Sequence, residues 1–174
     1  MNKKKWPLKA FIFSFITGLV VSGISNLIAN NAHLLTLCFI TIAITLVGIL
    51  FDMIGTAVLS SDEATFHAKA SNKIKGAKRA IYLIKNSSVI ASFCCDIIGD
   101  ACCIVSGAMS ATIAVYIFTN NPTLSESIIT LLLSSIVSSL TVGGKALGKD
   151  FSVKNADKIL FIAAKFLTKI KKEK

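Results

Sequence analysis

The sequence predicts an all-α integral membrane bundle of about four transmembrane helices, accompanied by amphipathic juxtamembrane helices. Composition, the lengths of the uncharged runs and the distribution of basic residues all indicate this class. Of the 174 residues, 53% are hydrophobic and only 16% are charged, and the mean hydropathy is +0.71. A soluble domain carries about 25% charged residues, because polar groups must cover its surface. The composition therefore excludes an ordinary soluble domain, a disordered chain and a coiled coil.

The uncharged runs give the positions of the four helices. No Asp, Glu, Lys or Arg lies between Lys9 and Asp52, a gap of 42 residues. Because about 20 apolar residues cross a bilayer once, this gap is long enough for two spans. Two further apolar runs follow later in the chain. The four expected spans are residues 10–28, 34–59, 88–118 and 128–142.

The 19 Lys and Arg residues are distributed unevenly: four precede the first span, six lie between the second and third, and nine follow the fourth. The loops around His33 and Pro122 contain none. Because cytoplasmic loops carry an excess of Lys and Arg, both termini and the middle loop are expected in the cytoplasm of a multi-pass cell-membrane protein. The same asymmetry accounts for the net charge of +10 without nucleic acid as a partner.

The first span has a second interpretation, as a secretory signal peptide, because it follows a basic start. Its 19 residues exceed the usual apolar run of about 7–15 residues, and no Ala-x-Ala cleavage site follows. An uncleaved anchor is therefore favoured, and cleavage would leave three spans. The expected organisation is a basic N-terminus with an extra helix (1–33), a main transmembrane domain (34–148) and a basic amphipathic helix (149–174).

Two segments outside the spans are amphipathic, residues 62–86 within the main domain and residues 149–174 after it. In the first, apolar residues recur at helical spacing with basic residues between them: Ile74, Ala77, Ile81 and Ile84. In the second, lysines lie opposite an apolar stripe of Ile159, Ala163, Phe166 and Ile170. Helices of this kind lie flat on the inner leaflet with their lysines over anionic headgroups. Anionic membrane lipids are therefore an expected partner.

Three carboxylates lie inside the hydrophobic runs: Asp52 in the second span, and Asp96 and Asp100 in the third. Each costs roughly 2.5–3.5 kcal/mol at a helix centre, so we expect all three to face the interior of the bundle or water. Asp96 and Asp100 share one helix face because of their i, i+4 spacing. At about 1.5 Å per residue, the three lie about 10, 12 and 18 Å from the inner ends of their spans. They are thus predicted to meet at a similar depth.

Carboxylates that meet at one depth admit three interpretations. A divalent cation such as Mg²⁺ prefers oxygen ligands and would remove the repulsion between them. A proton or Na⁺ relay is the second interpretation. Acids that are neutralised and hydrogen-bonded for helix packing are the third.

Other groups near the acids complete the predicted metal site. The candidate ligands beside the three carboxylates are the Ser106 hydroxyl and the backbone of Gly55 and Gly143. Glycines at the inner helix ends, with Thr56 and Gly144 beside them, indicate loosened backbone whose carbonyls can ligate ions. A row of small residues continues from Asp96 on the third span and predicts close contact with another helix: Gly99, Cys103 and Gly107.

Four stretches resemble motifs of one known family. They are Gly-Thr-Ala-Val from residue 55, Ala-Ile-Tyr-Leu-Ile-Lys-Asn ending at residue 86, Thr-Val-Gly-Gly-Lys-Ala-Leu-Gly at 141–148, and Asn-Ala-Asp-Lys-Ile at 155–159. In order, they resemble the small-x-x-Glu-Thr-Ala, Ala-x-x-Leu-Leu-x-Asn, Glu-x-x-Pro-Lys-x-x-Ala and Asn-x-Glu-Arg-Val motifs of the CNNM/CorB/CorC transmembrane domain. Members of that family are divalent-cation transporters linked to Mg²⁺ and Co²⁺. The similarity covers roughly residues 34–170.

The resemblance implies a homodimer with a Mg²⁺-like site in the three-helix core of each protomer. Several residues depart from the family pattern. Gly55 and Thr141 stand where the family has Glu, Gly144 replaces its Pro, and Asp52 stands at a small or Ser ligand position. The pair Asp96 and Asp100 resembles an Asn-x-x-x-Asn pair of the family with a two-residue offset. The family's CBS modules have no counterpart within these residues.

Two functions are expected from these observations. The first is binding and transport of a divalent cation, Mg²⁺ or also Co²⁺, through Asp52, Asp96 and Asp100. The alternative is a non-transporting membrane subunit or scaffold that dimerises with a CBS-containing relative. An enzyme is not expected, because His33 and His67 are placed on opposite sides of the membrane and no Ser-His-Asp, Cys-His or His-Glu-x-x-His arrangement exists.

Overall fold

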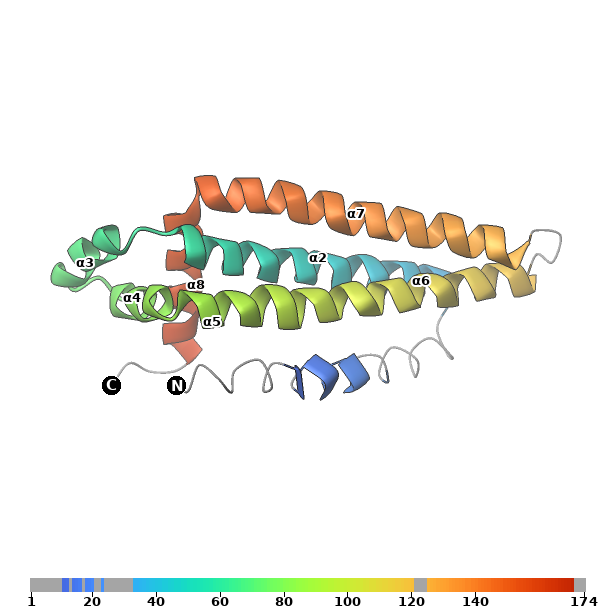
Figure 1. Ribbon diagram of the computed structural model, residues 1–174, viewed down its shortest axis with the longest axis horizontal. Coiled ribbons are helices and arrows are strands. Elements are labelled where there is room, and N and C mark those ends of the chain that lie inside the picture. Colours follow the sequence, from blue (N-terminus) through green and yellow to red (C-terminus); the bar gives the residue numbers. More distant parts are fainter. Residues whose placement is uncertain are drawn as a thin grey trace. The chain divides into compact units, whose positions relative to one another are not determined.

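The computed structural model describes residues 11–12, 14–16, 18–20, 23, 33–120 and 125–170, and these are helical almost throughout. Figure 1 shows the helices from α2 onward. They are α2 (Leu34–Ser60), α3 (Glu63–Ser71), α4 (Ala77–Lys85), α5 (Ser87–Ser92), the π-helix η2 (Phe93–Gly99), α6 (Asp100–Asn120), α7 (Glu126–Lys154) and α8 (Ala156–Ile170). No strand occurs within the described ranges, so the all-α prediction is confirmed for them.

Within the described residues, three helical stretches are long and apolar enough to cross a membrane: α2, the stretch Ser87–Asn120 and α7. They contain 27, 34 and 29 residues, respectively. At about 1.5 Å per residue even the shortest is about 40 Å long, more than the ~30 Å hydrocarbon core. An all-helical structure with three such helices is compatible with a helical membrane bundle, and these helices contain the second, third and fourth predicted spans. The first predicted span, residues 10–28, falls largely outside the described residues.

The last membrane-length helix continues well past the end of its apolar run. The hydropathy pattern places the end of the span at residue 142, whereas α7 ends at Lys154. The helix continues through Gly143 and Gly144 into Lys145, Ala146 and Leu147, which are good helix formers, so the change in polarity does not end it. Asn155 alone separates α7 from α8. The charged part of α7 therefore forms a rigid extension of the span.

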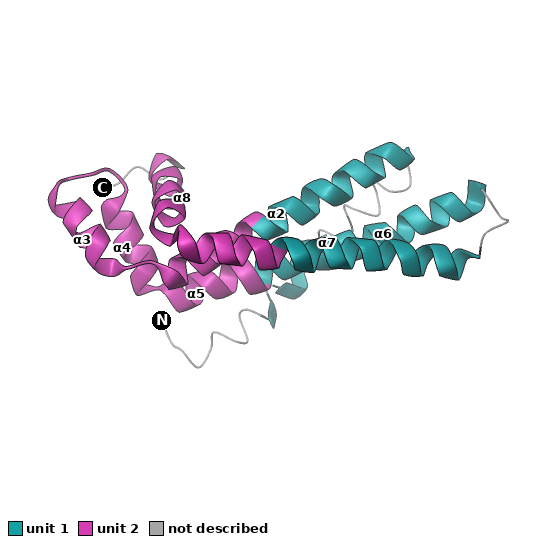
Figure 2. Ribbon diagram, turned by 90° about the horizontal axis from the view of Figure 1, so that it is seen from above, with its two compact units in different colours: residues 1–49, 97–144 teal, residues 50–96, 145–174 magenta. Residues whose placement is uncertain are grey.

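The chain divides into two compact units, which Figure 2 colours separately. Unit 1 comprises Met1–Ile49 and Ile97–Gly144, and unit 2 comprises Leu50–Asp96 and Lys145–Lys174. Asp52, Gly55 and Asp96 consequently belong to unit 2. The remaining candidate ligands, Asp100, Ser106 and Gly143, belong to unit 1.

The core of unit 1 forms between one face of α6 and the first part of α2. Its buried residues are Leu37 from α2 and Val105, Met109 and Ile113 from α6. The three α6 residues recur at every fourth position, so they lie on one face of that helix. Leu37, Val105 and Met109 are at most 1% exposed. This core is thus a contact between two apolar helix faces.

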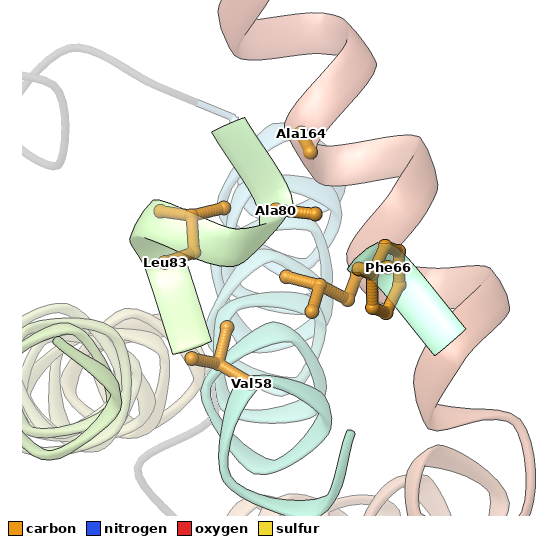
Figure 3. Close-up of a cluster of buried hydrophobic side chains, with 6 residues drawn as sticks. Val58, Phe66, Ala80, Leu83 and Ala164 are labelled. Atoms are coloured by element: carbon orange, nitrogen blue, oxygen red, sulfur yellow. The ribbon is translucent and has the colours of Figure 1, made fainter. Parts of the chain in front are cut away.

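The core of unit 2 joins the end of α2 to the three helices α3, α4 and α8. Figure 3 shows its side chains, five of them labelled, lying around a common interior. Phe66 of α3 is fully buried there and fills most of the space. Ala80 of α4 and Ala164 of α8 are small, which lets their helices lie close to the cluster. The six residues are Val58, Phe66, Ala80, Leu83, Leu160 and Ala164.

The apolar stripe expected to face the membrane on α8 is a different face from the one that α8 buries within unit 2. The residues that α8 buries are Ala156, Leu160 and Ala164, whereas Phe166 of the predicted stripe is 65% exposed. Both stripes have the helical period, so periodicity alone does not distinguish them. Unit 2 selects the face with two alanines, because small side chains allow close approach to α4, and leaves the bulkier face outside.

The segment 62–86, expected to form amphipathic helices, forms the two helices α3 and α4. The chain turns between α3 and α4 at Lys73 and Gly76, which have positive φ angles of 54° and 93°. Gly76 adopts a left-handed conformation that glycine tolerates without strain. Ala77 of the predicted stripe is fully buried, but Ile74 lies in the turn and is 41% exposed. The stripe was therefore correct only for the part that becomes α4.

The loosened backbone expected at the inner glycines is also wrong, because α2 and α7 run uninterrupted through them. Gly55 lies where α2 contacts η2, and a Cβ at this position would collide with Cys95 Sγ. Gly144 lies against Ile49 in the same way. These glycines allow close helix contact and do not free carbonyls. The irregular backbone occurs instead in η2, a π-helix, a rare form that is frequent at functional sites.

The contact at Gly55 generates a stability prediction. In Gly55→Ala the new methyl group meets Cys95 Sγ and lies 3.2 Å from Cys94 Cβ. Overpacking of this kind costs about 1–3 kcal/mol, so the melting temperature of the detergent-purified protein is expected to fall. Circular dichroism during thermal unfolding measures this change.

Gly143→Ala is the matched control, because no neighbouring atom lies within 4 Å of a Cβ at that position. Alanine stabilises a helix interior by roughly 0.5–1 kcal/mol relative to glycine, so this variant is expected to keep or raise the melting temperature. Equal losses in both variants would contradict a specific close contact at Gly55.

Candidate functional site

Asp52 is the one predicted ligand that the structure buries as a charged side chain. It is 3% exposed, although it lies on a helix long enough to cross a membrane. It lies eight residues before the end of α2 at Ser60, which corresponds to about 12 Å along the helix. A buried carboxylate is expensive unless a positive group accompanies it. The expectation that Asp52 faces the protein interior is thus confirmed.

Lys149 of α7 supplies that positive group. Its Nζ lies 3.4 Å from Asp52 Oδ2, and its own side chain is 54% exposed. The same Oδ2 makes no hydrogen bond to the described part of the chain. The two observations agree, because an ammonium group at this distance neutralises the carboxylate while its alignment falls short of a hydrogen bond. Asp52 therefore has a charge partner and keeps a free lone pair.

The other polar groups around Asp52 bond to main-chain carbonyls. Thr56 Oγ1 donates to the Asp52 carbonyl at 2.9 Å, and Cys95 Sγ donates to the same oxygen at 3.6 Å. Ser152 of α7, which is fully buried, donates to the Met53 carbonyl. These contacts hold α2 against η2 and α7 within unit 2. They also leave the carboxylate of Asp52 with Lys149 as its charged neighbour.

The other two acids differ from Asp52 in burial. Asp96 lies within η2 and Asp100 is the first residue of α6, and both are exposed. The sequence predicts that they face either the protein interior or water, and neither aspartate lies in the interior of this chain. Among the described residues, no three His, Cys, Asp or Glu side chains gather as a metal-binding group. The site formed by all three aspartates stays a prediction.

The remaining candidate ligands are placed as follows. Ser106 is fully buried, and its hydroxyl donates to the Cys103 carbonyl of its own helix at 3.0 Å. A hydroxyl bonded in this way needs no partner from another helix. Gly143 is exposed, and Gly55 lies one turn from Asp52 on α2. Of the predicted ligands, Gly55 alone is shown beside Asp52, and its contact is with the cysteines of η2.

The row of small residues on the third span is also distributed differently from the prediction. Gly99 is buried, Cys103 is half-buried and Gly107 is exposed. With 3.6 residues per turn, positions four apart drift by about 40° at each step, so the first and third members of this row face different directions. The exposed side carries Gly107 together with Asp96 and Asp100.

Sequence reasoning missed Lys149 and Ser152. Lys149 was counted among the nine basic residues that follow the last apolar run, where a lysine is ordinarily solvated. A signal for α7 was present, because small or hydroxyl residues recur every three or four positions along it: Thr141, Gly144, Gly148 and Ser152. Of these, Thr141, Gly148 and Ser152 are buried. Lys149 adjoins this stripe, which indicates that it lies beside a neighbouring helix.

Two surface hollows on the described residues lie away from Asp52. One of about 340 Å³ lies in unit 2 at the starts of α3 and α8, where the Asp62 N–H donates to Asp157 Oδ1 at 3.2 Å. The other, of about 420 Å³, is mainly apolar and lies in unit 1. Its lining consists of Phe11, Ser14, Phe15, Gly18, Leu19 and Ile104.

The chain matches no protein-family model, no curated protein and no solved structure. The resemblance to the CNNM/CorB/CorC family therefore rests on the motifs quoted above. The described residues form an all-helical structure with three helices long and apolar enough to cross a membrane, and the ion pair between buried Asp52 and half-exposed Lys149 is its most distinctive polar feature.

Proposed function

We propose that this chain is a multi-pass membrane protein that binds a divalent cation at Asp52 and transports it across the membrane. The observation that carries the proposal is a carboxylate only 3% exposed on a membrane-length helix. Its Oδ2 has Lys149 as charge partner and makes no hydrogen bond to the described residues. Ionisable side chains in such helices are costly, and they characteristically mark ion or proton pathways. The resemblance to divalent-cation transporters points in the same direction.

Mg²⁺ is the proposed ion, with Co²⁺ as a further substrate. Mg²⁺ keeps several of its waters and uses only one or two protein carboxylates, so a single buried aspartate suffices as its binding group. In this proposal Asp96 and Asp100 act as additional carboxylates along the path. Their exposure in the single chain is compatible with contact to water or to a second protomer.

The proposed location is the cell membrane, with α3, α4, α8 and both termini in the cytoplasm. Fifteen of the 19 basic residues lie in the 62–86 region or after residue 142, which supports this orientation. The outer face of α8 combines large apolar side chains with lysines. Ile162 is 68% and Phe166 is 65% exposed, and Lys158, Lys165 and Lys169 are exposed as well. Anionic lipid is the proposed partner of this face.

A second candidate function is supported by the exposed side of the third membrane-length stretch. Asp96, Asp100 and Gly107 are all exposed there, and a Cβ at Gly107 would have no neighbour within 4 Å. Lipid would penalise exposed acids in a spanning helix, whereas a second protein helix could cover them. The alternative proposal is accordingly a scaffold that pairs with another copy or with a CBS-containing relative.

Asp52→Asn is expected to lower Mg²⁺ flux into proteoliposomes at least about tenfold, because a charged ligand contributes roughly 1.5–3 kcal/mol. The control is Asp150→Asn, since Asp150 is 68% exposed and pairs with Lys154 on the surface of α7 at 2.7 Å. That control should retain normal flux. Stopped-flow measurement with Mg²⁺, Co²⁺ and Mn²⁺, with and without a sodium gradient, also separates a divalent-cation site from a Na⁺ relay. Unchanged flux in Asp52→Asn would overturn the transport proposal.

The lipid partner is tested in nanodiscs by hydrogen exchange of the α8 amides. Lysines near an anionic surface contribute about 1 kcal/mol each, so α8 is expected to exchange more slowly in phosphatidylserine discs than in phosphatidylcholine discs. The triple replacement of Lys158, Lys165 and Lys169 by Gln should remove this difference. Lys154→Gln is the single-site control, and an α8 insensitive to lipid charge in the natural protein would contradict the assignment.

A further inference from the structure

The pair formed by Asp52 and Lys149 suggests how the proposed site is regulated. We propose that Lys149 is a tethered internal cation that competes with the transported ion for Asp52, so that ion binding displaces the lysine. This inference rests on the proposed function, because it presumes that a cation binds at Asp52. It assigns to Lys149 a role that neither composition nor the family resemblance indicates.

The two members of the pair differ in freedom. The side chain of Asp52 is 4% exposed and is enclosed by its neighbours, whereas that of Lys149 is 54% exposed. A lysine ammonium group sits on a flexible four-carbon stem with several rotatable bonds. The carboxylate is therefore the fixed member of the pair, and the ammonium group is the member that can leave.

The contact is suited to exchange because it neutralises charge without a complete set of hydrogen bonds. Lys149 Nζ lies 3.4 Å from Oδ2, and that oxygen has no hydrogen bond to the described residues. A buried carboxylate without any cation is strongly unfavourable. Asp52 thus requires a cation, and because Lys149 is half-exposed, its ammonium group is the one that another cation can replace.

Electrostatics make the lysine and a divalent ion mutually exclusive. With Lys149 in place, the charges of the pair sum to zero. A divalent ion on Asp52 would give the site a charge of +1, and the ammonium group at ion-pair distance would then be repelled. The displaced side chain of Lys149 can extend toward headgroups and water, as long basic side chains near helix ends do.

The backbone around the pair is held in place, so the exchange needs only side-chain rotation. Ser152 lies one turn beyond Lys149 on α7 and is fully buried, and its hydroxyl donates to the Met53 carbonyl. Residues three apart lie on the same side of a helix, so this bond fixes α7 to α2 next to the pair. The neighbouring Asp150 is already paired with Lys154 at 2.7 Å and does not compete for Lys149.

Chemical labelling of lysines on the full chain in nanodiscs tests the displacement directly. An acylating reagent is applied with MgCl₂ or with choline chloride of equal ionic strength, and the modification of each lysine is quantified by mass spectrometry. Mg²⁺ is expected to raise the labelling of Lys149 severalfold and to leave Lys154 unchanged. In Asp52→Asn, Lys149 should be labelled rapidly with and without Mg²⁺.

Affinity provides the second measurement. Lys149→Gln removes the competitor and is expected to tighten Mg²⁺ binding about fivefold in calorimetry. This factor is the change in affinity that corresponds to the free energy of a partly exposed ion pair. Lys149→Arg keeps the charge and should keep the affinity of the natural protein. If Lys149→Gln is too unstable to purify, labelling of the natural chain decides the question on its own.

The outcomes separate the two proposals. Mg²⁺ that binds and is transported through Asp52 without changing the labelling of Lys149 would overturn the competition and leave the transport function intact. Mg²⁺ binding and flux that persist fully in Asp52→Asn would overturn the transport function itself. Labelling that rises in Asp52→Asn but never responds to Mg²⁺ in the natural chain would make the pair purely structural and also overturn the competition.

Discussion

A carboxylate enclosed by helices of membrane length needs a positive partner at all times, and this requirement shapes the surroundings of Asp52. Lys149 meets it from α7 at 3.4 Å, from a helix whose charged extension continues past the apolar run to Lys154. Because the buried carboxylate does not tolerate the absence of a cation, the two helices keep their register beside the pair. Ser152 provides that register through its bond to the Met53 carbonyl. The burial of this one carboxylate therefore determines both the charge partner at the site and the register of α2 and α7 beside it.

Small residues make the close contact around Asp52 sterically feasible. Gly55 admits Cys95 next to α2, and Cys95 in turn bonds to the Asp52 carbonyl at 3.6 Å. Val58, nearer the C-terminal end of α2, belongs to the core that α2 forms with α3, α4 and α8. Within unit 2 the charged pair and the apolar core are therefore connected through α2, whose helical backbone is unbroken between Asp52 and Val58.

The sequence predicts the helices and the burial of Asp52 well, because both follow from the cost of polar groups in hydrocarbon. It does not predict which face of α8 is buried, since its two apolar stripes share one period and only contact with α4 selects between them. It also misinterprets Gly55, because a glycine that loosens a helix and one that admits a neighbour look identical in one dimension. Lys149 is missed for a similar reason. A lysine beyond an apolar run is normally solvated, and its pairing depends on the register of two helices far apart in the chain.

The same register bears on ion selection under the proposed mechanism. A tethered ammonium group acts at a high effective concentration, because its covalent link keeps it near Asp52. A monovalent ion brings no more charge than the lysine it must displace, so it gains little from the exchange. A divalent ion gains about twice the Coulomb attraction at equal distance and also repels the departing lysine. Competition by Lys149 would therefore favour divalent over monovalent ions through charge alone. A site with one buried carboxylate would then discriminate between the two kinds of ion without a cage of several ligands.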